Sequence, residues 1–127
     1  MISPPTTILV ADDQKHMLVL LEASLAPLNC RMLAASSGEE VLVQAASTPI
    51  DLLLIDFEMA GLTGVQTVRQ LKENPRHADL PIIMITARGQ SRIRVEAMLA
   101  GVTLVILKPF SPVELLEAVR RLLKQTS

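Results

Sequence analysis

The sequence has very few aromatic residues and a single cysteine. Phe57 and Phe110 are the only aromatics among 127 residues, so the core must be built from aliphatic side chains. Cys30 has no second cysteine to pair with, which excludes an internal disulfide and is typical of a reduced, cytoplasmic protein. No apolar run is long enough to cross a membrane, and the first residues lack the charged and apolar blocks of a signal peptide.

The sequence also lacks an excess of charge of either sign. Its formal net charge is -1 at pH 7, and it has no basic run or basic tail. Direct binding to nucleic acid would need such a basic surface, so we do not expect it. Half of the residues are hydrophobic and 20% are charged, which is typical of a globular chain. We expect residues 1–6 to form a disordered lead-in and residues 7–125 to form a single domain.

Five short apolar segments predict five buried strands, and each is followed by a segment with helical spacing or helix-capping residues. The predicted strands are 7–11, 31–35, 51–55, 81–86 and 104–107. The predicted helices are 14–26, 37 to before Pro49, 63 to at least 71, 91–100, and 111 to about 124. Such alternation predicts an α/β fold, with a doubly wound, five-stranded parallel sheet and five helices on both of its faces.

Polar residues follow four of these strands at the point where each strand ends. Asp12 and Asp13 follow the first strand, Asp56 the third, Thr86 ends the fourth, and Lys108 follows the fifth. The carboxyl ends of parallel strands share one edge of a sheet, so these side chains are expected around one cleft. Each also has an ordinary explanation when taken alone: Asp13 can cap the first helix, and Lys108 can be a solvated charge.

The predicted cleft has the chemistry of a phosphate site. Three neighbouring carboxylates repel one another unless a cation lies between them. An acidic pocket of oxygen ligands suits magnesium or manganese, which binds carboxylates together with phosphate oxygens. One carboxylate then stays able to attack phosphorus and form an aspartyl phosphate. Lys108 and the Thr86 hydroxyl are suited to contact the phosphate oxygens, so the pattern predicts phosphoryl transfer.

This pattern resembles the response-regulator receiver domains, the CheY-like family of two-component signalling, over residues 7 to 124. The matching residues are Asp12-Asp13, Asp56, Gly64, Thr86-Ala87 and Lys108-Pro109-Phe110. The resemblance implies the sheet order 2-1-3-4-5 and a switch that is phosphorylated on Asp56. The donor would be the phosphohistidine of a sensor histidine kinase or a phosphotransfer protein, and an unidentified protein would be the downstream target.

The resemblance also implies roles for single residues. Asp13, Asp56 and the backbone carbonyl of Glu58 would bind the metal directly, and Asp12 would act partly through water. The Lys108–Pro109 bond would be cis. Glu58 and Arg88 would rim the cleft, tune the lifetime of the phosphoryl group, and pair across the mouth of the cleft.

Four features depart from the family pattern, and one of them is the pair of Glu58 and Arg88 just described. Ala60 stands where many receivers have Pro. Val105, at the switch position, stands where the family often has Tyr or Phe, so a signal must leave through the loop after Thr86 and the fourth helix, or through association. Residues 102–104 are Val-Thr-Leu instead of acidic or polar, so we expect an apolar face on the fourth helix, fifth strand and fifth helix, suited to a homodimer. His16 and His77 have no partner at metal-ligand spacing and are expected at the surface.

Two alternative functions stay open at this level. One is a degenerate receiver that binds partners without phosphorylation. The other is a phosphatase of the haloacid dehalogenase type, but there the nucleophile strand comes first, whereas here the acidic pair precedes Asp56. We therefore expect no enzyme beyond self-catalysed phosphoryl transfer and hydrolysis. The sequence names neither kinase nor target, and leaves open a stand-alone protein or one domain of a longer regulator.

Overall fold

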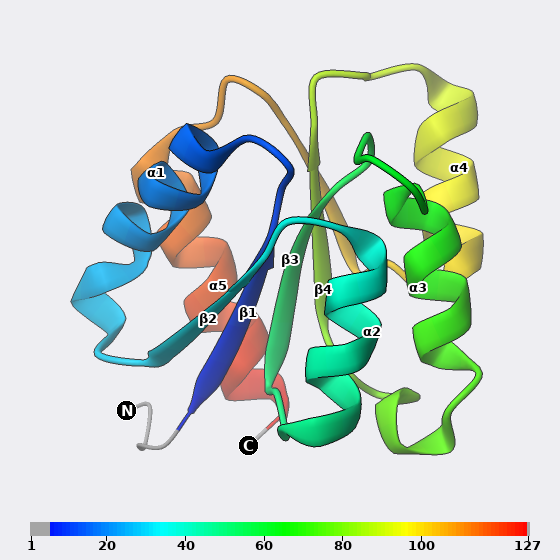
Figure 1. Ribbon diagram of the computed structural model, residues 1–127. Coiled ribbons are helices and arrows are strands. Elements are labelled where there is room, and N and C mark those ends of the chain that lie inside the picture. Colours follow the sequence, from blue (N-terminus) through cyan, green and yellow to red (C-terminus); the bar gives the residue numbers. More distant parts are fainter. Residues whose placement is uncertain (1–5, 127) are drawn as a thin grey trace.

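The computed structural model describes residues 6–126, and five parallel strands form one sheet between two layers of helices (Figure 1). The strand order is β2-β1-β3-β4-β5, so the predicted fold is confirmed. The strands are β1 (Thr7–Ala11), β2 (Arg31–Ala35), β3 (Leu52–Asp56), β4 (Ile82–Thr86) and β5 (Leu104–Leu107). The helices are α1 (Lys15–Leu25), α2 (Gly38–Ser47), α3 (Gly64–Lys72), α4 (Ser91–Ala100) and α5 (Pro112–Thr126), and the 3-10 turns are η1 (Ala26–Leu28) and η2 (Pro75–His77).

The expected lead-in falls on residues 1–5, which lie outside the described residues, and on Thr6. The Thr6 carbonyl accepts a hydrogen bond from the Arg31 amide at 2.9 Å, beside the pairing of β1 with β2. Within the described range, no helix is long and apolar enough to cross a membrane.

Two aliphatic clusters, one on each face of the sheet, form the core. Leu53 and Ile55 of β3 belong to the cluster under α2, α3 and α4, whereas Leu52 and Leu54 belong to the cluster under α1 and α5. Alternate residues of a strand point to opposite faces, so β3 is buried along its whole length. Full burial of each such side chain is worth about 1.5–3 kcal/mol, and β3 is therefore a rigid support for Asp56 at its end.

Capping side chains fix the starts of several helices, among them α2 and α3. Thr63 Oγ1 accepts a hydrogen bond from the Gln66 amide at 3.1 Å, and Gln66 Oε1 accepts one from the Thr63 amide at 2.9 Å, so a complete capping box starts α3. At α2, Ser37 Oγ accepts a hydrogen bond from the Glu40 amide at 3.1 Å. The Glu40 carboxylate bonds the Ser36 hydroxyl at 2.6 Å instead of returning to Ser37, so this box is only half formed.

Candidate functional site

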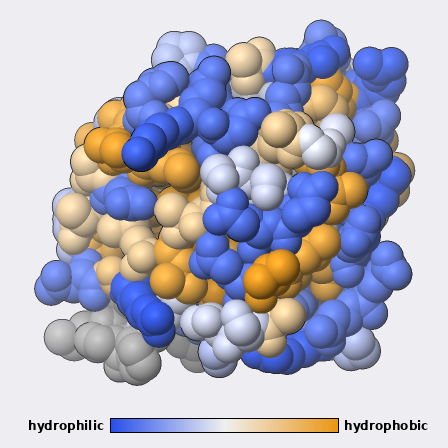
Figure 2. All heavy atoms as spheres, viewed as in Figure 1, coloured by the Kyte–Doolittle hydropathy of each residue, from blue (hydrophilic) through white to orange (hydrophobic). Residues whose placement is uncertain are grey.

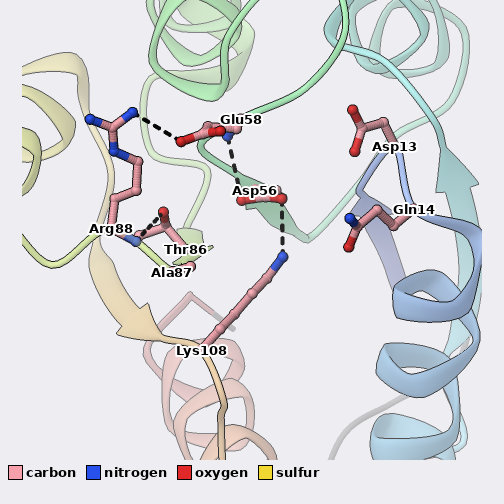
Figure 3. A pocket seen from close by; sticks show the side chains of 8 residues that line it. All are labelled: Asp13, Gln14, Asp56, Glu58, Thr86, Ala87, Arg88 and Lys108. Atoms are coloured by element: carbon pink, nitrogen blue, oxygen red, sulfur yellow. Dashed lines mark hydrogen bonds and ion pairs between the residues drawn. The ribbon is translucent and has the colours of Figure 1, made fainter.

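A cleft of about 320 Å³ lies at the carboxyl edge of the sheet, where the strand ends meet the following loops. Figure 3 shows its lining side chains, which come from the last residues of β3 and β4 and from the segments after β1, β3, β4 and β5. The lining residues are Asp13, Gln14, Asp56, Glu58, Thr86, Ala87, Arg88 and Lys108. The fold thus brings residues far apart in sequence around one cavity.

Lys108 lies between two buried carboxylates. Its Nζ is 3.1 Å from Asp12 Oδ2 and 3.0 Å from Asp56 Oδ2, the second contact being drawn in Figure 3. Burial raises the pKa of Asp56, Lys108 opposes this rise, and the Asp12 charge adds to it. Burial alone would lower the pKa of Lys108, but its hydrogen bonds to Asp56 and Asp12 outweigh burial and raise it. The ammonium group therefore neutralises part of a strongly acidic cavity.

The three aspartates form a group that suits a hard cation. Asp12, Asp13 and Asp56 each place a carboxylate oxygen within 4.8 Å of the others. Their oxygens are the ligand type that magnesium prefers, and Asp13 is exposed towards the cleft. Asp13 does not cap α1: the N-cap residue is Gln14, whose amide donates to Asp12 Oδ1 at 2.9 Å. The Asp13 carboxylate instead accepts a hydrogen bond from the Ala60 amide at 3.2 Å.

An ion pair crosses one side of the mouth of the cleft. Arg88 Nη1 is 3.0 Å from Glu58 Oε1, so the expected pairing is present. The Arg88 guanidinium carbon also lies 5.7 Å from the centre of the Phe57 ring, within the range of a cation–π contact. The Arg88 side chain is 41% exposed and the Glu58 side chain 62%, and such a surface pair contributes only about 0–1 kcal/mol.

Thr86 is buried at the end of β4, and its hydroxyl faces the loop that follows. Its Oγ1 accepts a hydrogen bond from the Arg88 amide at 3.0 Å, and its carbonyl accepts one from the Lys108 amide at 2.8 Å. The ends of β4 and β5 are thereby linked. The Lys108–Pro109 peptide bond is cis, as the resemblance implied. Val105, the expected switch position, is half-buried and packs against the core.

One cleft residue was missed by the sequence reasoning. Gln14 lines the cavity, although glutamine carries no signal of its own for phosphate or metal chemistry. The available signal was its position, because it follows Asp13 directly where the chain leaves β1 for α1.

One expectation about a histidine is wrong. His77 was expected at the surface, but it is only 5% exposed, and its Nδ1 has no hydrogen-bond partner among the described residues. Asn74 is the N-cap residue of the turn η2, and its side chain accepts a hydrogen bond from the Arg76 amide at 3.0 Å. This turn directs His77 inward beside Leu80, and His77 does not line the cleft that contains Asp56.

The reason given for an apolar association face is also wrong. Val102 is buried, and the Thr103 hydroxyl accepts a hydrogen bond from the Ile82 amide at 3.1 Å. This segment is therefore bound to the start of β4 and does not form an apolar surface. The exposed apolar side chains of that face lie mainly on α4, where Val95, Met98 and Leu99 are more than half exposed.

The fold and the cleft define a doubly wound α/β domain with an acidic pocket at the edge of its sheet, and comparison with known proteins specifies its family. A family model described as the response regulator receiver domain matches residues 8–120. The chain is 37% identical over 122 residues to the transcriptional regulatory protein ResD of Bacillus subtilis (strain 168), which covers 96% of this chain and 50% of ResD. It therefore belongs to the response regulator receiver domain family, whose members are two-component signalling proteins.

Solved structures agree with this assignment. A putative response regulator from Chloroflexus aurantiacus J-10-fl matches with a TM-score of 0.89 at 32% identity, covering 94% of this chain and 98% of that chain. A BeF3-activated DrrB receiver domain matches with a TM-score of 0.83 at 26% identity, covering 94% and 97%. The chain spans about half the length of the curated relatives it matches.

Replacing Lys108 with Met is expected to destabilise the protein at pH 7 by roughly 1–3 kcal/mol, because two buried carboxylates lose their cation. Without Lys108 the pKa of Asp56 rises further, because the hydrogen bond from Lys108 and the positive charge of Lys108 both lower that pKa. The ionised carboxylate is then destabilising, so the loss is largest above that pKa and shrinks as pH falls and Asp56 becomes protonated. Urea unfolding between pH 4 and pH 8 measures the effect.

The control for this experiment is Lys15→Met at the exposed start of α1. It is expected to change the free energy of unfolding by less than about 0.5 kcal/mol at every pH. If the loss of unfolding free energy in Lys108→Met did not depend on pH, that result would contradict an electrostatic role for the lysine.

Proposed function

We propose that the protein is a phosphorylatable switch of a two-component phosphorelay. Asp56 accepts a phosphoryl group from the phosphohistidine of a sensor histidine kinase or a phosphotransfer protein. The observation that carries this proposal is the contact of Lys108 with Asp12 and Asp56, beside Asp13 at the open edge of the sheet. It supports the proposal because phosphoryl transfer needs a nucleophile, an acidic metal site and a fixed positive charge, and the three aspartates and the lysine would supply them in one cavity.

Each residue of the cleft has a part in this proposal. Asp12, Asp13, Asp56 and the Glu58 carbonyl would hold magnesium or manganese, and the bound ion supplies positive charge for the phosphate oxygens. An Asp56 oxygen attacks phosphorus while the bond to the donor histidine breaks. Lys108 and the Thr86 hydroxyl then contact oxygens of the new phosphoryl group.

The switch is driven by the added charge. Phosphorylation adds about -1.5 to -2 charges at Asp56. Lys108 then exchanges part of its contact with Asp12 for phosphoryl oxygens, and the Thr86 hydroxyl turns from the Arg88 amide towards the cleft. Because Thr86 and Lys108 hold the ends of β4 and β5 together, the loops after these strands change their packing. Arg88 and Glu58, at the mouth, tune the lifetime of the phosphoryl group.

A protein donor has to reach the cleft in order to transfer its phosphoryl group. Helix α1 starts at the cleft, and Figure 2 shows apolar side chains over this helix on the left of the molecule. Val19 and Leu20 of α1 are exposed, so this helix offers the donor an apolar contact next to Asp13.

We place the protein in the cytoplasm, with its kinase, and assign its single receiver domain to residues 7–125.

A second surface is suited to the output of the signal. Val95, Met98 and Leu99 expose apolar side chains on α4, and Leu107 and Val113 extend this surface onto β5 and the start of α5. We assign this face to an unidentified target protein or to a homodimer, and phosphorylation controls it through the loop between Thr86 and α4.

Acetyl phosphate and magnesium test the function directly. Wild-type protein is expected to gain one phosphoryl group, measured by intact mass, and EDTA is expected to prevent the gain because the acidic cluster then lacks its cation. Magnesium alone should stabilise the fold by about 1.4 kcal/mol at ten times its Kd. Absence of labelling, together with beryllofluoride that leaves the association state unchanged, would favour a receiver that acts without phosphorylation. Turnover of phosphomonoesters would instead favour a haloacid-dehalogenase-type phosphatase.

A further inference from the structure

Gln14 differs from the other polar residues of the cleft in having a side chain without a partner. Its carboxamide makes no hydrogen bond to any residue that the structure describes. The other polar side chains that line the cleft each have a partner at 3.0–3.2 Å: Asp13, Asp56, Glu58, Thr86, Arg88 and Lys108. The amide of Gln14 is therefore available to a molecule that enters the cleft.

The backbone holds the base of this side chain in place. The Gln14 amide donates to Asp12 Oδ1 at 2.9 Å, and its carbonyl accepts hydrogen bonds from the Met17 and Leu18 amides at 3.0 and 3.3 Å. Figure 3 shows the side chain extending from the start of α1 towards the middle of the cleft, on the opposite side from Arg88. Gln14 thus has a fixed origin and a free polar end beside the phosphate site.

The opposite side of the mouth is already occupied. Glu58 and Arg88 bind each other at 3.0 Å, and the Arg88 guanidinium lies over the ring of Phe57. Water can therefore reach Asp56 on the Gln14 side of the cleft while the Glu58–Arg88 ion pair stays intact. A water molecule on that side meets a carboxamide, which can accept one hydrogen bond and donate another at the same time.

We propose that Gln14 positions the water that hydrolyses the phosphoryl group on Asp56, an inference that rests on the proposed function. The Gln14 Oε1 atom accepts a hydrogen bond from the water, while Nε2 donates one to a phosphoryl oxygen. The water oxygen bonds to phosphorus, and the bond from phosphorus to the Asp56 oxygen breaks with its electron pair left on the carboxylate. The water proton leaves with the released phosphate. A carboxamide takes no proton at neutral pH, so Gln14 acts by orientation alone.

The test compares Gln14→Met with Gln90→Met. Gln90 is also an exposed N-cap residue without a side-chain capping bond, but it starts α4 and does not line the cleft. Each protein is labelled with acetyl phosphate and magnesium, the reagent is removed, and the loss of the phosphoryl group is followed by intact mass. We expect about tenfold slower hydrolysis in Gln14→Met, the effect of one lost hydrogen bond in the transition state. The control should decay as the wild type does.

Two further measurements separate positioning from a structural effect. Labelling of Gln14→Met should slow by a smaller factor than its hydrolysis, because Gln14 orients a water molecule only in hydrolysis. The magnesium affinity of the variant should stay within about twofold of the wild type, because Asp12, Asp13 and Asp56 are unchanged. Labelling followed by unchanged decay would overturn the role of Gln14 and leave the proposed function standing. Labelling and decay slowed by the same factor would also overturn it, since that result indicates a distorted cleft. Wild-type protein that takes no label would refute the proposed function, and this inference with it.

Discussion

Asp56→Asn is expected to abolish labelling by acetyl phosphate and to raise the free energy of unfolding at pH 7. Labelling is lost because a neutral carboxamide cannot act as the nucleophile that a carboxylate provides. The fold is kept because asparagine has nearly the same shape and the rest of β3 is apolar and buried on both faces. Intact mass after treatment with acetyl phosphate and magnesium measures the first effect, and urea unfolding measures the second.

The gain in stability follows from the pKa of Asp56, which burial raises above its ordinary value of 3.8. A carboxyl group with a raised folded pKa is destabilising once ionised, so the wild type loses stability as pH rises through the interval between its unfolded and folded pKa values. The variant does not titrate there. The free energies of unfolding of the wild type and the variant should therefore become similar below this pH interval and differ by on the order of 1 kcal/mol above it.

Asp51→Asn is the matched control for this substitution. Asp51 lies just before β3, at the opposite end from Asp56, and its Oδ2 accepts a hydrogen bond from the Thr7 amide at 2.8 Å. Asparagine can still accept that bond, so labelling should equal that of the wild type. An Asp56→Asn protein that takes the label at the wild-type rate would show that the phosphoryl group goes to another residue.

The sequence was sufficient to predict the cleft because its main residues follow from one geometric rule. Asp12, Asp56, Thr86 and Lys108 stand at strand ends, and parallel strands bring such ends to one edge. The rule works because the intervening strands are continuous apolar runs with definite ends. The ion pair of Glu58 with Arg88 was also expected, but from the resemblance to receiver domains, which implied that both residues rim the cleft.

Features that depend on loop geometry were beyond the sequence argument. The orientation of His77 depends on a single turn that is capped by Asn74, and the sequence around this turn is mostly polar. The exposure of Val95, Met98 and Leu99 depends on which side of α4 faces α3. The hydrophobic pattern of that helix is weak, since apolar residues occur on both sides of it, and so the sequence did not distinguish the buried side from the exposed one.

Gly64→Ala is expected to cost roughly 3 kcal/mol of unfolding free energy, the largest change in stability that we anticipate for a single methyl group. A Cβ atom at Gly64 would overlap the backbone carbonyl oxygen of Asp56 and would lie 3.0 Å from Met84 Cε. The carbonyl cannot move aside freely, because β3 is paired with β1 and β4 and the Gly64 amide donates to the Phe57 carbonyl at 2.8 Å. Urea unfolding of the purified variant measures this cost.

Gly89→Ala provides the control, because a Cβ atom there would meet the Leu107 methyl groups at 3.2 Å, and these can rotate away. Its cost should stay below about 1 kcal/mol. Since the overlap at Gly64 is with the acceptor residue itself, Gly64→Ala should also slow labelling by acetyl phosphate in the fraction that stays folded, whereas Gly89→Ala should label normally. Equal stability of the two variants would mean that β3 yields at its end, and Asp56 would then lack the rigid support that its reaction geometry requires.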